Sequence, residues 1–70
     1  MGKVKSLKDK LFGAAVLKMS FRLRGDEGSA AFKHVYPGVI RDLGLEDTAV
    51  ESYISENQAA VEAAARGKPA

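Results

Sequence analysis

The sequence has no cysteine and only one histidine among its 70 residues, and it contains no long apolar run. Without cysteine there is neither a disulfide framework nor a thiolate metal site, and one imidazole does not supply the ligands of a structural zinc. The longest apolar run, from Leu11 to Leu17, is far shorter than the roughly 20 residues that span a bilayer. We therefore expect a protein that holds no metal and does not cross a membrane.

Groups that would carry catalysis are also missing. The sequence has no glycine-rich phosphate loop and no arrangement of serine, histidine and acid that spacing supports. His34, the only imidazole, has no acid cluster near it in the sequence, so we interpret it as a structural residue. We expect no enzyme activity, no catalytic or cofactor-binding residue, no cofactor and no small-molecule substrate.

What the sequence does have is opposite charge in its two parts. Residues 1–24 carry seven Lys or Arg and one acid, whereas residues 25–70 carry four Lys or Arg and eight acids. One interpretation is that the basic segment folds onto an acidic helix of its own chain. The other is that Lys8, Lys18 and Arg22 form a basic surface for phosphate or anionic lipid.

The N-terminal segment has the features of a basic amphipathic helix. Ser6 and Asp9 have the spacing of a capping box, which predicts a helix that begins directly after Ser6 and stops at Gly25. Residues 17–24, however, alternate apolar and polar side chains without a fault, which is the period of a half-buried strand. The alternative to the helix is a hairpin at 17–36, which would make the fold α+β.

The next segment has a second helix start. Ser29 is placed to cap a short helix that ends at Tyr36, since the residue before a proline is pushed out of the helical region. Pro37 then suits the first position of a following helix.

Residues 39–54 read as a short helix, a turn and a longer helix. The spacing resembles the helix-turn-helix family, in which a small residue is followed four positions later by the turn glycine and six beyond that by an apolar residue. The positions that carry this resemblance are Ile40, Gly44, Val50, Tyr53 and Ile54. The resemblance covers under a quarter of the chain and implies that the second helix would face a DNA major groove.

Two features depart from that family. Ile40 stands where the family usually has alanine, and the second helix is acidic at its start, with Glu46, Asp47 and Glu51 and no Lys or Arg before Arg66. DNA binding depends mostly on cations that contact phosphate. A DNA-binding regulator would therefore need the basic N-terminal segment to supply those contacts.

The C-terminal part predicts one helix from Thr48 to about Arg66. Apolar and small residues recur along it at spacings of four and three, the seam of a packed helix pair, and the seam includes an asparagine that could set the register. This seam packs either within the monomer or against a partner. We predict that the partner-binding residues are Asn57, Ala60, Val61 and Ala64.

Together these patterns predict one domain over residues 1–70, with flexible tails at 1–5 and 67–70. The predicted fold is all-α, a bundle of three to four helices with a helix-turn-helix-like corner. We expect a cytoplasmic accessory or regulatory subunit that binds a protein partner or a second copy of itself through its basic and acidic helices. The alternatives are a small DNA-binding regulator and a peptide that associates with a membrane surface.

Overall fold

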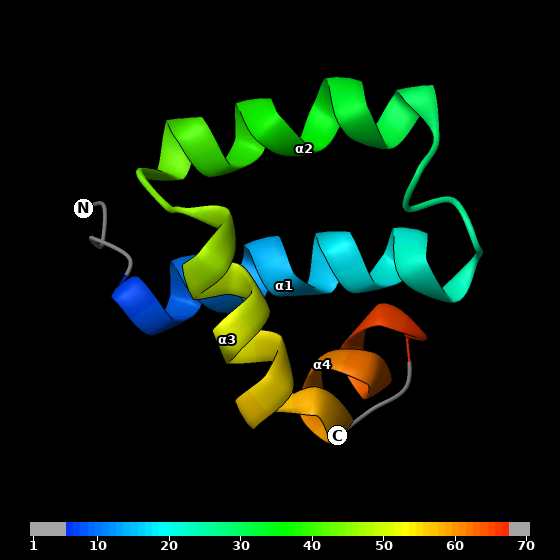
Figure 1. The fold of residues 1–70 in the computed structure, drawn as a ribbon. Helices are drawn as coiled ribbons and strands as arrows, with labels where there is room; N and C mark the ends of the chain where they lie inside the picture. The colour runs from blue at the N-terminus through cyan, green and yellow to red at the C-terminus, as the bar shows by residue number, and fades with distance from the viewer. Residues whose placement is uncertain (1–5, 68–70) are drawn as a thin grey trace.

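The computed structural model describes residues 6–67 of the chain. This part forms four helices, α1 (Leu7–Leu23), α2 (Ala30–Leu43), α3 (Asp47–Glu56) and α4 (Gln58–Ala65), as Figure 1 shows. It contains no strand, so the prediction of a small all-α bundle is confirmed. The alternative hairpin at 17–36 is wrong, because α1 and α2 occupy most of those residues. The predicted tails lie outside the described residues, except for Gly67.

Helix α1 begins where the sequence predicts. The hydroxyl oxygen of Ser6 accepts a hydrogen bond from the backbone N–H of Asp9 at 3.2 Å, which satisfies one of the free amides of the first turn. At the other end, the chain leaves the helix at Arg24 and Gly25. Local hydrogen bonding therefore fixes both ends of the longest helix.

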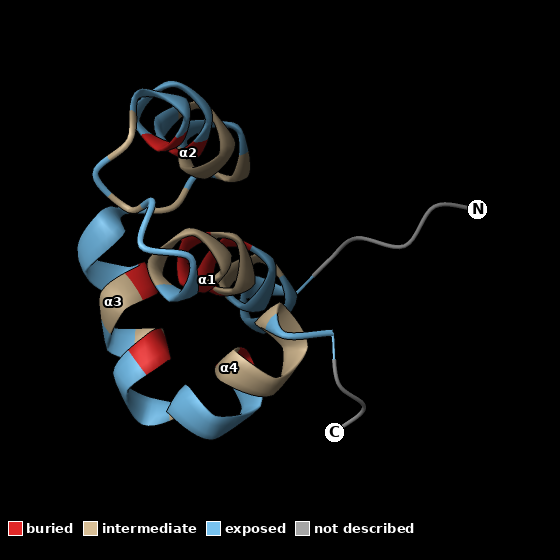
Figure 2. Ribbon diagram, turned by 90° about the vertical axis from the view of Figure 1, so that its right-hand side faces the viewer, coloured by how far each residue is buried: buried red, intermediate tan, exposed pale blue. Residues whose placement is uncertain are grey.

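Helix α1 is the centre of the fold. Helices α2, α3 and α4 each pack against it, and Figure 2 shows them around three of its sides. All four helices contribute to one apolar core, whose buried residues are Ala14, Ala15, Met19, Phe32, Tyr36, Val50, Ile54 and Val61. Two of the residues that α1 gives to this core are alanines, which let neighbouring helices approach closely.

Helix α2 differs from the sequence-based expectation. It runs without a break from Ala30 to Leu43, with Pro37 inside it rather than at the start of a new helix. Ser29 does cap it, since its side chain accepts from the N–H of Phe32 at 3.2 Å. Pro37 is exposed, so water can bind the carbonyl of Lys33 that the missing N–H would have bonded. The proline is tolerated because it lies on the solvent side.

The predicted single helix from Thr48 to Arg66 is also wrong, because Asn57 interrupts it. Asn57 has φ −131° and ψ 33°, and its side-chain amide donates to the carbonyl of Tyr53 at 3.1 Å. An asparagine side chain that bonds a carbonyl four residues back competes with the helical ladder. The break turns α4 back toward α1, and Val61 becomes fully buried.

The joint between α2 and α3 has the predicted glycine turn. Gly44 takes the left-handed conformation with φ 72°, and the N–H of Leu45 donates to the carbonyl of Ile40 at 2.8 Å. Leu43 and Leu45 on either side are half-buried against the core. The helix-turn-helix resemblance itself stays a prediction.

Candidate functional site

An ion-pair network joins α1 to the start of α3. Lys18 lies on α1 with only 6% of its surface exposed, and its ammonium donates to Asp47 Oδ1 at 2.7 Å and pairs with Glu51. A buried ammonium is costly unless anions and hydrogen bonds compensate it. Asp47 and Glu51 are one helical turn apart on α3, so both reach the same cation.

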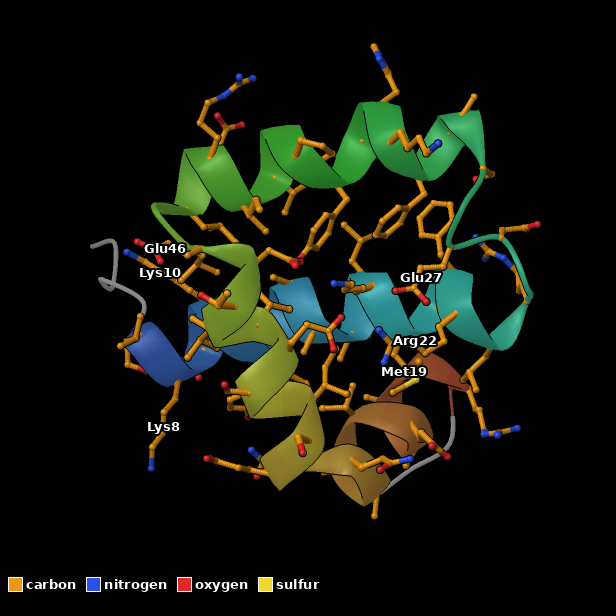
Figure 3. The ribbon with its side chains drawn as sticks, viewed as in Figure 1. Lys8, Lys10, Met19, Arg22, Glu27 and Glu46 are labelled. Carbon is orange, nitrogen blue, oxygen red and sulfur yellow. The ribbon has the colours of Figure 1, made fainter. Side chains whose placement is uncertain are left out.

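Arg22, one turn after Lys18, extends the network toward the loop that precedes α2. Its Nε and Nη2 donate to the two carboxylate oxygens of Glu27, each at 2.8 Å, and Nη2 also donates to Glu51 at 2.8 Å. Figure 3 shows Arg22 and Glu27 facing each other. The two-point contact is the strong form of an arginine–carboxylate pair.

Helix α2 enters the same network through Tyr36. Its hydroxyl donates to Asp47 Oδ1 at 2.6 Å, and the Lys18 ammonium lies 5.1 Å from the centre of its ring, within the range of a cation–π contact. We use the name ion-pair network for Lys18, Arg22, Glu27, Tyr36, Asp47 and Glu51. The network therefore connects the first three helices.

The network fixes the protonation of its acids. Hydrogen bonds from Lys18 lower the pKa of both Asp47 and Glu51, and bonds from Tyr36 and Arg22 add to the effect. The hydrogen bond from Arg22 likewise lowers the pKa of Glu27. All three carboxylates are therefore ionised at neutral pH.

The proton donors of the network are held in their protonated forms. Burial by itself lowers the pKa of Lys18, but the bonds and charges of Asp47 and Glu51 outweigh it and raise the value. Burial raises the pKa of Tyr36, and its bond to Asp47 raises it further. A general acid or base needs a pKa near the working pH, and each of these shifts moves a group away from neutrality. The arrangement suits a structural contact rather than proton transfer.

The predicted basic surface is divided by the fold. Lys18 is buried and Arg22 is half-buried, and both are paired with acids, so neither belongs to an open basic surface. Lys8 is exposed at the start of α1, and Figure 3 shows it pointing away from Arg22 and Glu27. The physical reason is that the apolar stem of Lys18 packs in the core while its ammonium reaches acids of α3. Of the two interpretations of the charge asymmetry, the intramolecular one describes Lys18 and Arg22.

The residues predicted to bind a partner do not share one open face either. Val61 is fully buried in the monomer core, and Asn57 and Ala64 are half-buried. Only Ala60 is exposed. Val61 thus packs within the monomer, and partner binding through the seam stays a prediction.

A groove with several apolar side chains lies between α1 and α3. It has a volume of about 550 Å³ and is lined by Leu7, Lys8, Leu11, Tyr53, Glu56 and Asn57, and we call it the α1–α3 groove. Leu7 is 64% exposed. Phe12, 36% exposed, meets the ring of Tyr53 edge-on at 6.4 Å between ring centres. This is a concave surface whose walls carry apolar side chains and one charge of each sign.

The α1–α3 groove was not predicted from the sequence. Leu7 and Leu11 are four residues apart and share one side of α1, which is a signal that the sequence does contain. Tyr53 is more than forty positions away, and only the crossing of α3 over α1 brings it beside them. The groove is therefore a product of tertiary packing.

Comparisons with protein-family models, curated proteins and solved structures find no match to this chain. Over residues 6–67, no group of three or more His, Asp or Glu side chains is placed to hold a metal ion. In the same part of the chain, every helix is too short or too polar to span a bilayer.

Proposed function

We propose that the protein is a non-enzymatic interaction module, a small accessory or regulatory subunit that binds an amphipathic helix of a protein partner in its α1–α3 groove. The observation that carries this proposal is the exposure of Leu7 in the lining of a groove to which Leu11 and Tyr53 add apolar surface. Large apolar side chains gathered around a concavity mark sites of protein binding more often than scattered ones do. A 70-residue domain also gains stability from a partner, because it buries less of its surface than a larger domain does.

The shape of the groove favours a helical ligand. It lies between two helices, and an apolar groove of this kind accepts side chains spaced three and four residues apart on a third helix. Leu11 and Tyr53 give the apolar contact, while Lys8 stands on the α1 wall and Glu56 on the α3 wall. The fitting partner carries an acid on its side toward Lys8 and a base on its side toward Glu56.

The contact surfaces expected from the sequence support the proposal less well. The basic side chains Lys18 and Arg22 and the acidic Asp47 and Glu51 are paired with one another, so an outside partner would have to compete with these internal ion pairs. The exposed Ala60 on α4 offers only a methyl group. We therefore propose that the interaction module binds its partner through the groove and not through these basic and acidic side chains.

The test uses a photoreactive amino acid in place of Leu7, expressed in the source cells in the full chain. Position 59 on α4, an exposed alanine, serves as the control site. The proposal expects a protein that is cross-linked from position 7 and not from position 59, through a segment with an apolar helical face. The same cross-links from both positions, or none from position 7, would overturn it.

A binding measurement then tests the groove directly. The cross-linked segment, made as a peptide, should bind the full chain, and Leu7→Glu should weaken binding by about tenfold or more. Ala59→Glu introduces the same charge at an exposed site of α4 and should leave the affinity unchanged. Equal effects of the two substitutions would mean that the peptide binds elsewhere.

A second candidate is a small DNA-binding regulator, which the left-handed turn at Gly44 favours. Its difficulty is that Lys18 and Arg22 are engaged by acids, which leaves Lys8 and the other exposed cations to contact phosphate. A duplex titration at low salt distinguishes this function, since phosphate binding weakens steeply as salt rises. No binding at low salt would sink it.

A further inference from the structure

Helix α1 has apolar residues on every side, while the other helices cover only three of its sides. In Figure 2 none of the other described helices lies on its fourth side, between α2 and α4. At 100° per residue, this side carries six residues that we call the open strip of α1, namely Asp9, Gly13, Val16, Leu17, Ser20 and Arg24. Asp9, Gly13 and Arg24 are exposed, whereas Val16, Leu17 and Ser20 are half-buried, with Val16 and Leu17 packed against the edge of the core. Phe12 and Leu23, both exposed, lie along one margin of the strip. The outer side of a surface helix is normally polar, and this one is largely apolar or small.

Gly13 lies in the middle of the open strip and is not required by the packing of the monomer. A Cβ at this position would meet no atom within 4 Å. Glycine inside a helix is destabilising relative to alanine, because it gives up more freedom on folding. A glycine at such a place allows another backbone to come close.

Ser20 is the second small residue of the strip, and its polarity is already satisfied. Its hydroxyl donates to the carbonyl of Val16 at 2.9 Å, within its own helix. A surface that faces Ser20 therefore does not have to supply a hydrogen bond. Gly13 and Ser20 are thus two positions on the strip where a small side chain lets another helix come close.

The six residues are arranged symmetrically about the midpoint between Val16 and Leu17. If two copies of α1 lie antiparallel about that point, Asp9 of one copy faces Arg24 of the other, and Gly13 faces Ser20. Val16 and Leu17 then face each other at the centre. Arg24 lies just beyond Leu23 in helical conformation, and its guanidinium lies 4.8 Å from the centre of the Phe21 ring. Its pair with Asp26 at 3.6 Å is more than half exposed on both sides, so this ion pair can exchange for one with Asp9 of a second copy.

We propose that a second copy of this chain covers the open strip, with the two α1 helices antiparallel about a two-fold axis between Val16 and Leu17. Each interface of this kind pairs an acid with a base twice, sets a small residue against a small residue twice, and buries the apolar centre. A parallel pair would set Asp9 against Asp9 and Arg24 against Arg24, so charge selects the antiparallel pair. Because one strip makes a small interface, we expect a weak dimer that dissociates on dilution.

The first test measures mass against concentration for the full chain by sedimentation equilibrium. The mass should rise from the 7.5 kDa of the monomer toward twice that value. Asp9→Arg alone, or Arg24→Asp alone, places like charges opposite each other and should weaken the dimer by about tenfold or more. A mixture of these two variants pairs unlike charges again and should recover the dimer. A monomer at all concentrations overturns the proposal.

Matched controls separate the strip from the general effect of charge. Asp42→Arg and Arg41→Asp make the same changes at exposed positions of α2 and should leave dimerisation unchanged. Circular dichroism confirms that each variant is helical. If the α2 variants weaken the dimer as much as the α1 variants do, the two-fold register is wrong.

The second test uses the lack of cysteine in the chain. Gly13→Cys and Ser20→Cys copies, mixed and oxidised, should form the disulfide between position 13 and position 20 in preference to either symmetric disulfide. A Cβ at position 13 has open space in the monomer, so this variant should fold. A majority of symmetric disulfides would overturn the antiparallel register.

The dimer is independent of the α1–α3 groove. Leu7 and Leu11 lie on the opposite side of α1 from the open strip, so Leu7→Glu should leave the dissociation of the dimer unchanged. Loss of partner binding with an intact dimer, or the reverse, separates the failure of one proposal from the failure of the other.

Discussion

Replacing Lys18 with methionine should cost the fold little, although it removes the cation that Asp47 and Glu51 share. The side chains of these two acids are 53% and 41% exposed, so water can solvate them once the ammonium is gone. Tyr36 still donates to Asp47, and Arg22 still donates to Glu51. Methionine fills the space of the lysine stem, and we expect the free energy of unfolding to change by at most about 1 kcal/mol.

The reverse change should be much more damaging. Asp47→Asn together with Glu51→Gln leaves the Lys18 side chain, only 7% exposed, as a buried charge without an anion. Breaking a buried pair in this way costs about 3–5 kcal/mol. A chain of 70 residues has a total stability of about 4–10 kcal/mol, so the double variant should be close to unfolding.

Urea unfolding followed by circular dichroism measures both changes. Adding Lys18→Met to the double variant should restore most of the lost stability, since no buried charge is then left unpaired. Glu27→Gln is the control, because it removes a partner of Arg22 and leaves Lys18 paired. If Lys18→Met alone lowers stability as much as the two acid substitutions do, water does not solvate Asp47 and Glu51 in the way that their exposure implies, and the prediction is wrong.

Three further predictions follow from the same contacts and from backbone geometry. Asp47 and Glu51 have folded pKa values below their ordinary 3.8 and 4.5, so the stability they contribute is present above those ordinary values and is lost as the pH falls through the folded ones. An acid titration at fixed urea should show this loss, and constant stability down to strong acid would contradict it. Gly13→Ala should raise the free energy of unfolding by about 0.5–1 kcal/mol, because its Cβ has open space, whereas Gly44→Ala at φ 72° should lower it by about 1–2 kcal/mol. Thermal unfolding compares the two variants, and equal shifts of the midpoint temperature would contradict the different backbone conformations of Gly13 and Gly44. Val61→Ala should cost about 2–3 kcal/mol in a urea titration, since Val61 is fully buried, and a loss below about 0.5 kcal/mol would contradict its place in the core.

The starts of the first two helices could be predicted because their causes are local. Ser6 and Ser29 each accept a backbone hydrogen bond from the residue three positions later, so a few neighbouring residues are sufficient to specify the cap. The turn at Gly44 is local in the same way. These two caps and this turn could therefore be predicted from neighbouring residues alone.

Two helix boundaries could not be predicted because they depend on distant neighbours. Pro37 is compatible with a continuous helix only because it falls on the exposed side of α2, and that side is set by how Phe32 and Tyr36 pack on α1. Asn57 suits a helical seam as well as it suits a break. The break leaves Val61 buried against the core, and that gain depends on where α1 lies.

The ion-pair network was only half predictable. The division of charge along the chain favoured contact between the basic and acidic segments as one of two interpretations, and that contact exists. Which lysine makes it could not be predicted, since Lys8 and Lys18 both belong to the basic helix and only Lys18 lies level with Asp47. The position along α1 at which α3 crosses it decides which lysine meets Asp47, and no local sequence pattern specifies that position.

The strict alternation of residues 17–24, which is typical of a strand, has a different meaning in a helix surrounded by neighbours. Residues four apart share one side of a helix, so eight alternating residues make four pairs on four sides. The pairs are Leu17 with Phe21, Lys18 with Arg22, Met19 with Leu23, and Ser20 with Arg24. The first three meet other helices of the described chain, since Phe21 contacts Phe32 of α2, the two cations pair with Glu51 of α3, and Met19 and Leu23 line a hollow with residues of α4. The fourth pair lies on the open strip, as does Leu17 of the first pair, and it is there that we place a second copy of the chain.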